Sequence, residues 1–274
     1  MLLALALGAA GIAVLPKGLG QVARALGTTA APPHREIAER RWRRHLAVEG
    51  SALDRVLSYT PYIAVGTPSR PEIALTFDDG PGPYTAQIVR TLVRSRAPGT
   101  FFVVGSQVAT FRRALQDIVA TGFPIGNHTF THRSLTSLSP TDQSAEIDGQ
   151  AAAITRYGAP SPRLFRPPYG SFDRRTLELL RAKRMLMVLW TVDTEDYLSP
   201  GVDAIVSRAL EQARPGAIIA LHDGGGDRSQ TVAAIPQIVQ GLRARGYRLV
   251  TVPRLVLDDP PPRNQPVPVS LSDG

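Results

Sequence analysis

The sequence contains no cysteine among its 274 residues, which excludes disulfide bridges and thiolate metal sites. Nitrogen and oxygen atoms must therefore hold any metal ion. Histidine is scarce as well, with five residues in the chain, and aromatic residues make up only 6%. Hydrophobic residues at 43% and charged residues at 20% exclude global disorder and predict one sizeable folded domain with extensions.

Acidic residues are fewer than basic ones, which gives the chain a formal charge of +8 and a pI near 10.4. Such a charge attracts nucleic acid, anionic membranes or anionic cell walls. The arginines are dispersed apart from the run between Arg40 and Arg44, and no nucleic-acid motif accompanies that run. We therefore expect no nucleic-acid partner and favour a partner in the cell envelope.

The two ends of the chain differ in composition from its middle. Residues 1–30 begin with an almost wholly apolar stretch and are interpreted as a hydrophobic signal or anchor segment and linker. A buried terminal helix is the alternative, because the stretch is short for a membrane span. Residues 31–70 predict a charged helical and extended connector, and residues 257–274 a flexible proline-rich tail. We expect an extracellular or cell-envelope protein, secreted or membrane-anchored by its N-terminal segment.

Residues 71–256 alternate between two apolar patterns, one typical of strands and one of helices. The predicted strands are Glu72–Phe77, Thr100–Val104, Leu164–Phe165, Met185–Thr191, Ala217–Leu221 and Arg248–Val252. The predicted helices are Ala86–Val93, Val108–Thr121, Thr141–Tyr157, Arg174–Lys183, Ala204–Ala213 and Val232–Arg245. The alternation favours an α/β fold with parallel strands, a closed or distorted (β/α) barrel, and functional groups at the carboxyl ends of the strands.

Five short segments concentrate the acid, base and metal-ligand chemistry, and they contain three of the five histidines. They are Thr76–Gly80, His128–His132, Arg166–Gly170, Asp193–Asp196 and Ile219–His222. Most of them follow a predicted strand, where a parallel barrel collects its functional side chains.

The first segment places two adjacent carboxylates, Asp78 and Asp79, where a predicted strand passes into a Gly-Pro turn. At such a transition both side chains can reach one cavity in different orientations. One carboxylate can then bind a cation while the other handles a proton. The alternative is that the pair caps a turn or a helix, which is common for such residues.

In the second segment His128 and His132 are four residues apart, so that one helical turn would place both imidazoles on a single face. Together with Asp79 they supply two nitrogens and one carboxylate. Such a set leaves an open position for water, as a catalytic zinc site requires. Two unrelated surface or core histidines remain the alternative.

The ordered set of segments resembles the polysaccharide deacetylase family, the NodB-like domain of carbohydrate esterase family 4, over residues 71–253. This resemblance implies a distorted barrel and the metal-dependent removal of acetyl groups from N-acetylated sugars. It implies that Asp79, His128 and His132 bind the metal and that Asp78 is the catalytic base. It also places an oxyanion-binding backbone N–H at Tyr169.

The resemblance assigns the remaining acid and base groups. It implies that His222 protonates the leaving nitrogen and that Arg166 pairs with Asp78 and keeps it ionised. Asp193 is expected to orient His222 and to favour its protonated form, while Asp196 is the other acidic position of the same segment. The resemblance leaves the division between these two carboxylates open.

Three further positions concern the substrate groove. Many relatives carry Trp where this chain has Tyr197, which keeps an aromatic wall there. The resemblance implies an apolar wall for the acetyl methyl group in the last segment, with Ile219 in the usual leucine position and Leu221 beside His222. Trp190 is expected to lie in the core, because an apolar stretch precedes it.

The expected reaction is hydrolytic N-deacetylation of N-acetylglucosamine residues in a cell-wall or related polysaccharide, with peptidoglycan favoured. A chitooligosaccharide deacetylase and an acetylxylan esterase would use the same site. A noncatalytic carbohydrate-binding protein is the alternative of another class. The ligand set favours zinc and also suits cobalt, nickel or iron. Other expected features are an N-acetylated glycan partner, membrane association through the N-terminal segment and a monomeric state.

Overall fold

The computed structural model describes residues 48–263. The predicted signal or anchor segment, residues 1–30, lies outside the described residues, as do residues 31–47 of the connector and 264–274 of the tail. Within the described part, no helix is both long enough and apolar enough to cross a bilayer.

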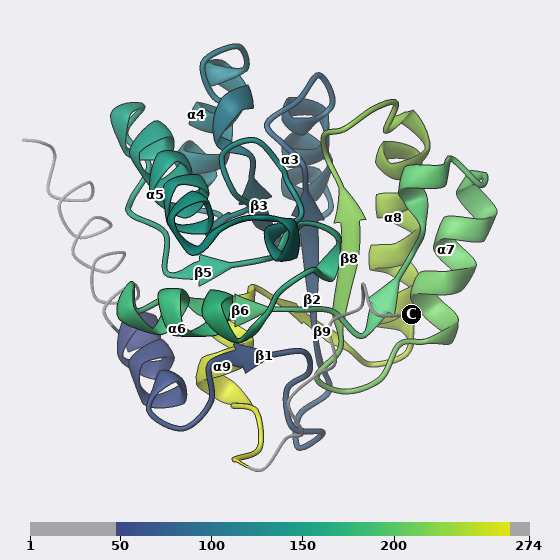
Figure 1. Cartoon of the computed structure of the whole chain (residues 1–274). Coiled ribbons are helices and arrows are strands. Elements are labelled where there is room, and N and C mark those ends of the chain that lie inside the picture. Colours follow the sequence, from purple (N-terminus) through teal and green to yellow (C-terminus); the bar gives the residue numbers. More distant parts are fainter. Residues whose placement is uncertain (1–47, 264–274) are drawn as a thin grey trace, which may run out of the picture. The chain divides into compact units, whose positions relative to one another are not determined.

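Nine short strands of the described chain form one sheet (Figure 1). In chain order they are β1 Tyr62–Ile63, β2 Glu72–Asp78, β3 Thr100–Val103, β4 Ile125–Asn127, β5 Leu164–Phe165, β6 Leu186–Val188, β7 Val192–Asp193, β8 Ile218–His222 and β9 Arg248–Val250. Their spatial order is β1-β6-β5-β4-β3-β2-β8-β7, with β9 pairing to β2.

All pairings between these strands are parallel. The carboxyl ends of the strands therefore meet at one edge of the sheet. The sheet curls without closing, since β1 and β7 stand at opposite ends of the strand order. The predicted distorted (β/α) barrel is confirmed in this open form.

Helices connect the strands, as the alternating pattern predicts. They are α3 Thr85–Arg94, α4 Arg112–Thr121, α5 Pro140–Arg156, α6 Arg174–Ala182, α7 Val202–Glu211, α8 Ser229–Ala244 and α9 Val252–Asp258. Four single 3₁₀ turns add η1 Gly105–Gln107, η2 Leu135–Ser137, η3 Pro168–Gly170 and η4 Asp196–Leu198. Two of these turns, η3 and η4, belong to the predicted site segments.

The central strand β2 is buried along its whole length, and its side chains alternate between two cores. Ile73, Leu75 and Phe77 pack beneath the helices of the outer layer. Ala74 faces the inside of the curled sheet together with Phe102 of β3. A strand buried on both faces reads as a continuous apolar run, which is how the sequence revealed it.

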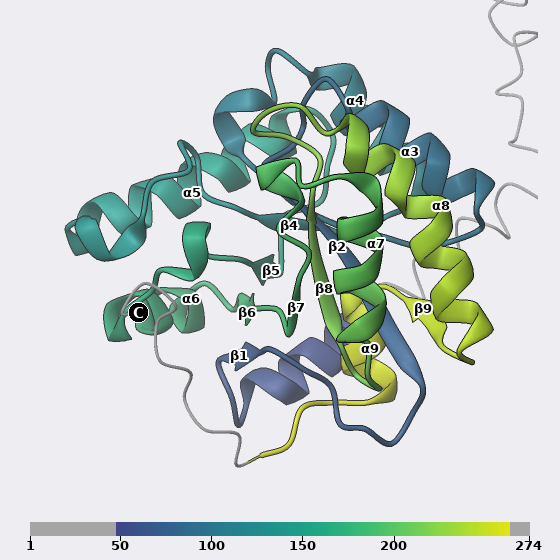
Figure 2. The ribbon, with the colours of Figure 1, turned by 90° about the vertical axis from the view of Figure 1, so that its right-hand side faces the viewer.

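Four helices cover one side of the sheet. Figure 2 shows α7 and α8 side by side, with α3 and α4 continuing the same layer. Their apolar faces share one core with β2, β3 and β8. This layer holds the strands from outside and leaves their carboxyl ends open for the site.

The predicted connector is part of the domain from residue 48 onward. Residues 48–57 are helical, and Leu53 and Val56 are buried in the core inside the curled sheet. The segment then forms β1, which pairs in parallel with β6. Apolar residues at helical spacing bury this segment although charged residues surround them.

The start of the predicted tail is packed rather than flexible. Residues 252–258 form α9, which lies near residues 48–57 (Figure 1), and Leu255 belongs to the same inner core. Asp259 is buried and accepts hydrogen bonds from the hydroxyl groups of Thr67 and Ser69. Residues 257–263 are therefore tied to the domain, in contrast to the predicted tail.

Candidate metal and catalytic site

Asp78 and Asp79 stand where β2 ends, and they point in different directions. Asp78 is the last residue of the strand and is buried. Asp79 has φ of 71°, a left-handed conformation that aspartate tolerates better than most residues. The turn separates the two carboxylates, so that both reach the same cavity.

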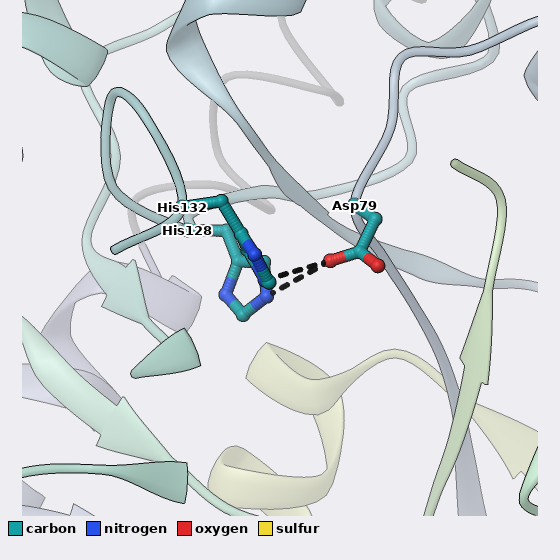
Figure 3. A group of neighbouring side chains, drawn as sticks. All are labelled: Asp79, His128 and His132. Atoms are coloured by element: carbon teal, nitrogen blue, oxygen red, sulfur yellow. Dashed lines mark ion pairs between the residues drawn. The ribbon is translucent and has the colours of Figure 1, made fainter. Parts of the chain in front are cut away.

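Asp79 faces the two histidines of the second segment. Its Oδ1 lies 3.0 Å from His132 Nε2 and 3.4 Å from His128 Nε2 (Figure 3). Burial opposes ionisation of this carboxyl, but its close contacts with the two imidazoles lower the pKa of Asp79 well below its usual range. The carboxylate therefore carries its charge at neutral pH.

The histidines do not share a helical turn, contrary to the sequence-based prediction. They follow β4 in an irregular loop, and Thr129 and His132 both have left-handed backbones, with φ of 63° and 62°. The loop folds back so that the centroids of the two imidazole rings lie 4.9 Å apart. His128 and His132 thus converge through loop geometry rather than helical periodicity.

A backbone carbonyl fixes the tautomer of His128. Its Nδ1 lies 2.7 Å from the carbonyl oxygen of Arg166, which accepts the ring proton. The lone pair of Nε2 is then free to bind a metal ion. The Arg166 carbonyl therefore acts as an outer support for this ligand.

Asp79, His128 and His132 offer three ligand atoms within 4.8 Å of one another. No other such cluster occurs in residues 48–263. Oδ1 of Asp79 is buried and has no hydrogen-bond partner, so a bound cation would satisfy this oxygen. Two imidazoles and one carboxylate also suit a divalent metal chemically, so the residues fit such an ion.

Arg166 binds the second carboxylate from beneath. Its guanidinium is fully buried, and Nη1 lies 2.9 and 3.1 Å from the two oxygens of Asp78. Nε and Nη2 donate to the carbonyls of Val188 and Leu189. Arg166 thus holds the Asp78 carboxylate at the cavity in a charge-assisted ion pair, where it can accept a proton.

His222 ends β8 on the other side of the cavity and pairs with Asp196, not with Asp193. Nδ1 lies 2.7 Å from Asp196 Oδ1, and the backbone N–H of His222 donates to Oδ2 at 2.9 Å. Thr231 donates to the same carboxylate. Burial alone would lower the pKa of His222, but the hydrogen bond and charge of Asp196 raise it to about 9.

Asp193 occupies a different place from the one predicted for it. Its Oδ1 accepts the backbone N–H of Glu195 at 2.8 Å, and its carboxylate lines the cavity. Burial raises the pKa of Asp193, and the nearby charge of His222 opposes that shift. The η4 turn carries Asp196 back under His222, which gives Asp196 the role predicted for Asp193.

Aromatic side chains flank the site. Tyr169 is 64% exposed, and its ring stands edge-on to His132 at 4.8 Å. Tyr197 is 45% exposed, and its ring centroid lies 5.2 Å from that of His222. Trp190, expected in the core, packs partly on it and also lines the cavity. The three rings give the site walls on which a sugar can stack.

The predicted apolar wall on β8 is wrong for both residues named. Ile219 and Leu221 are fully buried in the core beneath the outer helices. Because side chains alternate along a strand, Ala220 and His222 face the cavity instead. The small side chain of Ala220 leaves room in the cavity at this point.

Sequence reasoning missed Asp223, which directly follows His222. It is 1% exposed, Thr85 donates to its Oδ2, and burial raises its pKa to about 7. A Cβ on Gly80 would collide with this carboxylate, so that turn requires glycine. The aspartate between His222 and three glycines was the signal that the loop packs closely on the Asp78–Gly80 turn.

The two carboxylates at the end of β2, both histidines of the loop and His222 open into one cavity of about 810 Å³. It is lined by acidic, histidine and aromatic side chains with a single arginine: Asp78, Asp79, His128, His132, Pro167, Tyr169, Trp190, Asp193, Tyr197, Ala220, His222, Gly225 and Arg228. The sequence did not indicate Gly225 and Arg228. A proton acceptor, a potential metal centre and a protonated imidazole therefore surround one space.

The chain is similar in sequence to known proteins. The family model for polysaccharide deacetylases matches residues 65–188. A peptidoglycan-N-acetylglucosamine deacetylase from Bacillus cereus is 37% identical over 211 residues, which cover 74% of this chain and 97% of that protein. A chitooligosaccharide deacetylase from Bradyrhizobium is 38% identical over 197 residues, covering 67% and 90%.

A solved structure agrees with the sequence comparisons. The crystal structure of a peptidoglycan N-acetylglucosamine deacetylase superposes with a TM-score of 0.69 at 30% identity. The match covers 71% of this chain and 92% of that one. Nearly the whole of each of these relatives is therefore represented here.

Proposed function

The chain is a member of the polysaccharide deacetylase family, carbohydrate esterase family 4, and we propose that it removes acetyl groups from N-acetylglucosamine residues of peptidoglycan. Membership makes it a hydrolase. The observation that carries the proposal is the meeting of Asp78, the Asp79–His128–His132 cluster and His222 around one cavity. These are the groups that amide hydrolysis requires.

The proposed reaction begins with the base. Asp78 takes a proton from the attacking water, and the ion pair with Arg166 holds its carboxylate in place. Asp79, His128 and His132 would hold a divalent metal ion. Such an ion would act as a Lewis acid on the acetamide carbonyl and would lower the pKa of the attacking water.

The second half of the reaction needs an acid, because an amide nitrogen leaves poorly until it is protonated. His222 carries a proton at neutral pH, since Asp196 raises its pKa to about 9. It donates this proton to the nitrogen as the carbon–nitrogen bond breaks, so that water and amide yield acetate and a free amine. The backbone N–H of Tyr169 is the proposed partner of the oxyanion.

Peptidoglycan is favoured over neutral oligosaccharides for two reasons. The chain carries a formal charge of +8, which attracts an anionic wall. A peptidoglycan deacetylase is also among its relatives. Chitooligosaccharides are the second candidate, because several relatives are named for that activity.

Location, metal identity and oligomeric state complete the proposal. We propose export to the cell envelope, secreted or membrane-anchored through residues 1–30, on the basis of their apolar composition. Zinc is the favoured metal, with cobalt, nickel or iron as alternatives. The protein is proposed to act as a monomer. Metal analysis of the protein as purified and fractionation of the producing cells test the metal and the location.

Product analysis on separate polymers tests the substrate. The zinc-loaded protein is given peptidoglycan, N-acetylchitooligosaccharides and acetylated xylan, and acetate and free amino sugars are measured. We expect the highest kcat/KM on peptidoglycan. A higher value on chitooligosaccharides would select the second candidate, and a rate on acetylated xylan above that on every amide would overturn the amidase assignment.

A further inference from the structure

The loop that carries both histidines is strained and needs external support. Thr129 and His132 have left-handed backbones, which are unfavourable for residues with a side chain. The loop follows β4 and contains no regular hydrogen-bonded element between His128 and His132. Contacts from neighbouring elements must therefore hold it in the geometry that brings the two imidazoles together.

Glu146 of α5 supplies the most concentrated of these contacts. Its side chain reaches the loop from the helix that packs beside it and is 9% exposed. Oε2 accepts the backbone N–H groups of Phe130 at 2.9 Å and Thr131 at 2.7 Å. Oε1 accepts the hydroxyl of Thr131. One buried carboxylate thus binds three donors of the loop, which compensates the cost of its burial.

The two histidines differ in how they are otherwise held. The ring of His128 donates to the Arg166 carbonyl, which fixes its direction independently of the loop. The ring of His132 is more exposed, at 24%, and stands edge-on to Tyr169. The position of His132 therefore depends on the backbone of the loop, where Thr129 Oγ1 accepts the His132 N–H at 3.0 Å and Glu146 holds the two residues between them.

We propose that Glu146 is a positioning residue of the metal centre. By fixing the backbone at Phe130 and Thr131, it sets the place of His132 Nε2 relative to Asp79. This inference rests on the metal centre of the proposed function and assigns to α5 a part in metal affinity.

Three substitutions of Glu146 distinguish the effect of its side-chain length from the effect of its charge. Glu146→Ala removes all three acceptor contacts. Glu146→Asp keeps the charge but withdraws the carboxylate by one methylene group. Glu146→Gln preserves the contacts, because its carbonyl oxygen can accept both backbone N–H groups while its amide donates to the Thr131 hydroxyl.

Zinc affinity of the full chain is the readout, measured by competition with a chromophoric chelator in the absence of any substrate. We expect Glu146→Ala and Glu146→Asp to raise the zinc Kd by about tenfold to a hundredfold, as loss of outer supports does at other metal sites. Glu146→Gln should stay within about threefold of the unaltered protein, since the supporting contacts persist.

A matched control tests for a merely structural effect. Gln143 lies one turn earlier on α5, is fully buried, and bonds to the Leu135 carbonyl and the Thr176 hydroxyl, away from the histidine loop. Gln143→Ala should lower the melting temperature without changing the zinc Kd. Circular dichroism confirms that each variant is folded, and the Asp variant carries the test if the Ala variant does not fold.

The outcomes separate this inference from the proposed function. Unaltered zinc affinity in folded Ala and Asp variants overturns the role of Glu146 alone, as does an equal loss in Gln143→Ala. A failure of the unaltered chain to bind zinc overturns the metal centre and this inference together. Absence of activity on every glycan with normal zinc binding contradicts the proposed function only.

Discussion

The imidazole of His222 shows how one neighbouring carboxylate sets the chemistry of a side chain. Burial disfavours its charged form, but the hydrogen bond and charge of Asp196 reverse that effect and raise the pKa to about 9. His222 is therefore protonated at neutral pH and loses its proton as the pH rises through that value. A step that draws on this proton should slow on the alkaline side.

Replacing Asp196 should shift the pH dependence of the reaction. In Asp196→Asn the support for the imidazolium is lost, so the pKa of His222 falls and the alkaline limb of kcat moves to lower pH by about one unit or more. The pH profile of kcat measures this. Asp193→Asn is the matched control and should leave the limb nearly in place, because Asp193 does not bond to His222. An unmoved limb in Asp196→Asn would contradict the assignment.

The residue types of the site were predictable, but their local partners were not. The pairing of Asp79 with His128 and His132 followed from ligand chemistry and from the family resemblance. The turn that brings Asp196 rather than Asp193 to His222 depends on left-handed backbones at Glu195 and Ser199. The spacing of residues in the sequence does not reveal such backbones. Glu146 lies in a helical pattern and gave no signal, because its partners are backbone groups.

At the scale of elements, alternation along β8 divides its side chains between cavity and core. Ala220→Val should narrow the cavity and raise KM with little change in stability. Leu221→Ala should lower the free energy of unfolding by about 2–5 kcal/mol and leave KM unchanged, because it empties a fully buried position. Steady-state kinetics measure KM, and urea unfolding measures the free energy of unfolding, for each of the two variants. A raised KM in a stably folded Leu221→Ala variant would show that Leu221 contacts the substrate, as the sequence predicted.

Arg166 ties three strands together, which makes it a structural as well as a functional group. From the end of β5 it donates to Thr76 and Asp78 on β2 and to carbonyls at the end of β6. Arg166→Lys cannot reproduce this planar set of donors. We expect a loss of about 3–5 kcal/mol in the free energy of unfolding, because the buried Asp78 is left poorly paired.

Urea unfolding of the Arg166→Lys variant gives this loss directly. Arg174→Lys is the control, since the side chain of Arg174 is 91% exposed and only pairs with Glu178 on the surface. That change should cost less than about 0.5 kcal/mol. Equal stabilities of the two variants would show that Arg166 does not hold the strands.

Long elements were predicted well, and short strands were predicted only in part. The seven-residue β2 and the helices α5 and α8 differ from their predicted bounds by a few residues. β1, β4 and β7 were missed, because two or three residues carry little periodicity, although the equally short β5 was predicted. The helix predicted from Val108 begins at Arg112, because residues 108–111 form turns between η1 and the helix.

At the scale of the whole molecule, the domain extends further toward the N-terminus than its composition indicates. Leu53 is 4% exposed and lies in the inner core, whereas Val48 of the same helical segment is 50% exposed. Leu53→Asp would bury an unpaired charge and should cost more than about 3 kcal/mol of folding free energy. Val48→Asp should change it by less than about 0.5 kcal/mol.

Thermal and urea unfolding of the two variants compare these costs. A similar small effect of both would mean that residues 48–57 are a detachable connector, as composition predicts. The inner core that they share with α9 argues for the larger cost at Leu53. Charged neighbours concealed this packing from a reading based on average composition.

The measurement that tests the central claim most directly is acetate release from peptidoglycan and N-acetylglucosamine oligomers by the chelator-treated protein, before and after zinc is added, with Asp78→Asn alongside. We predict that zinc restores acetate release and that Asp78→Asn, although it binds zinc, reduces kcat by about a hundredfold or more. Acetate release that survives chelation or this substitution, or none at all from zinc-loaded protein, would contradict the account.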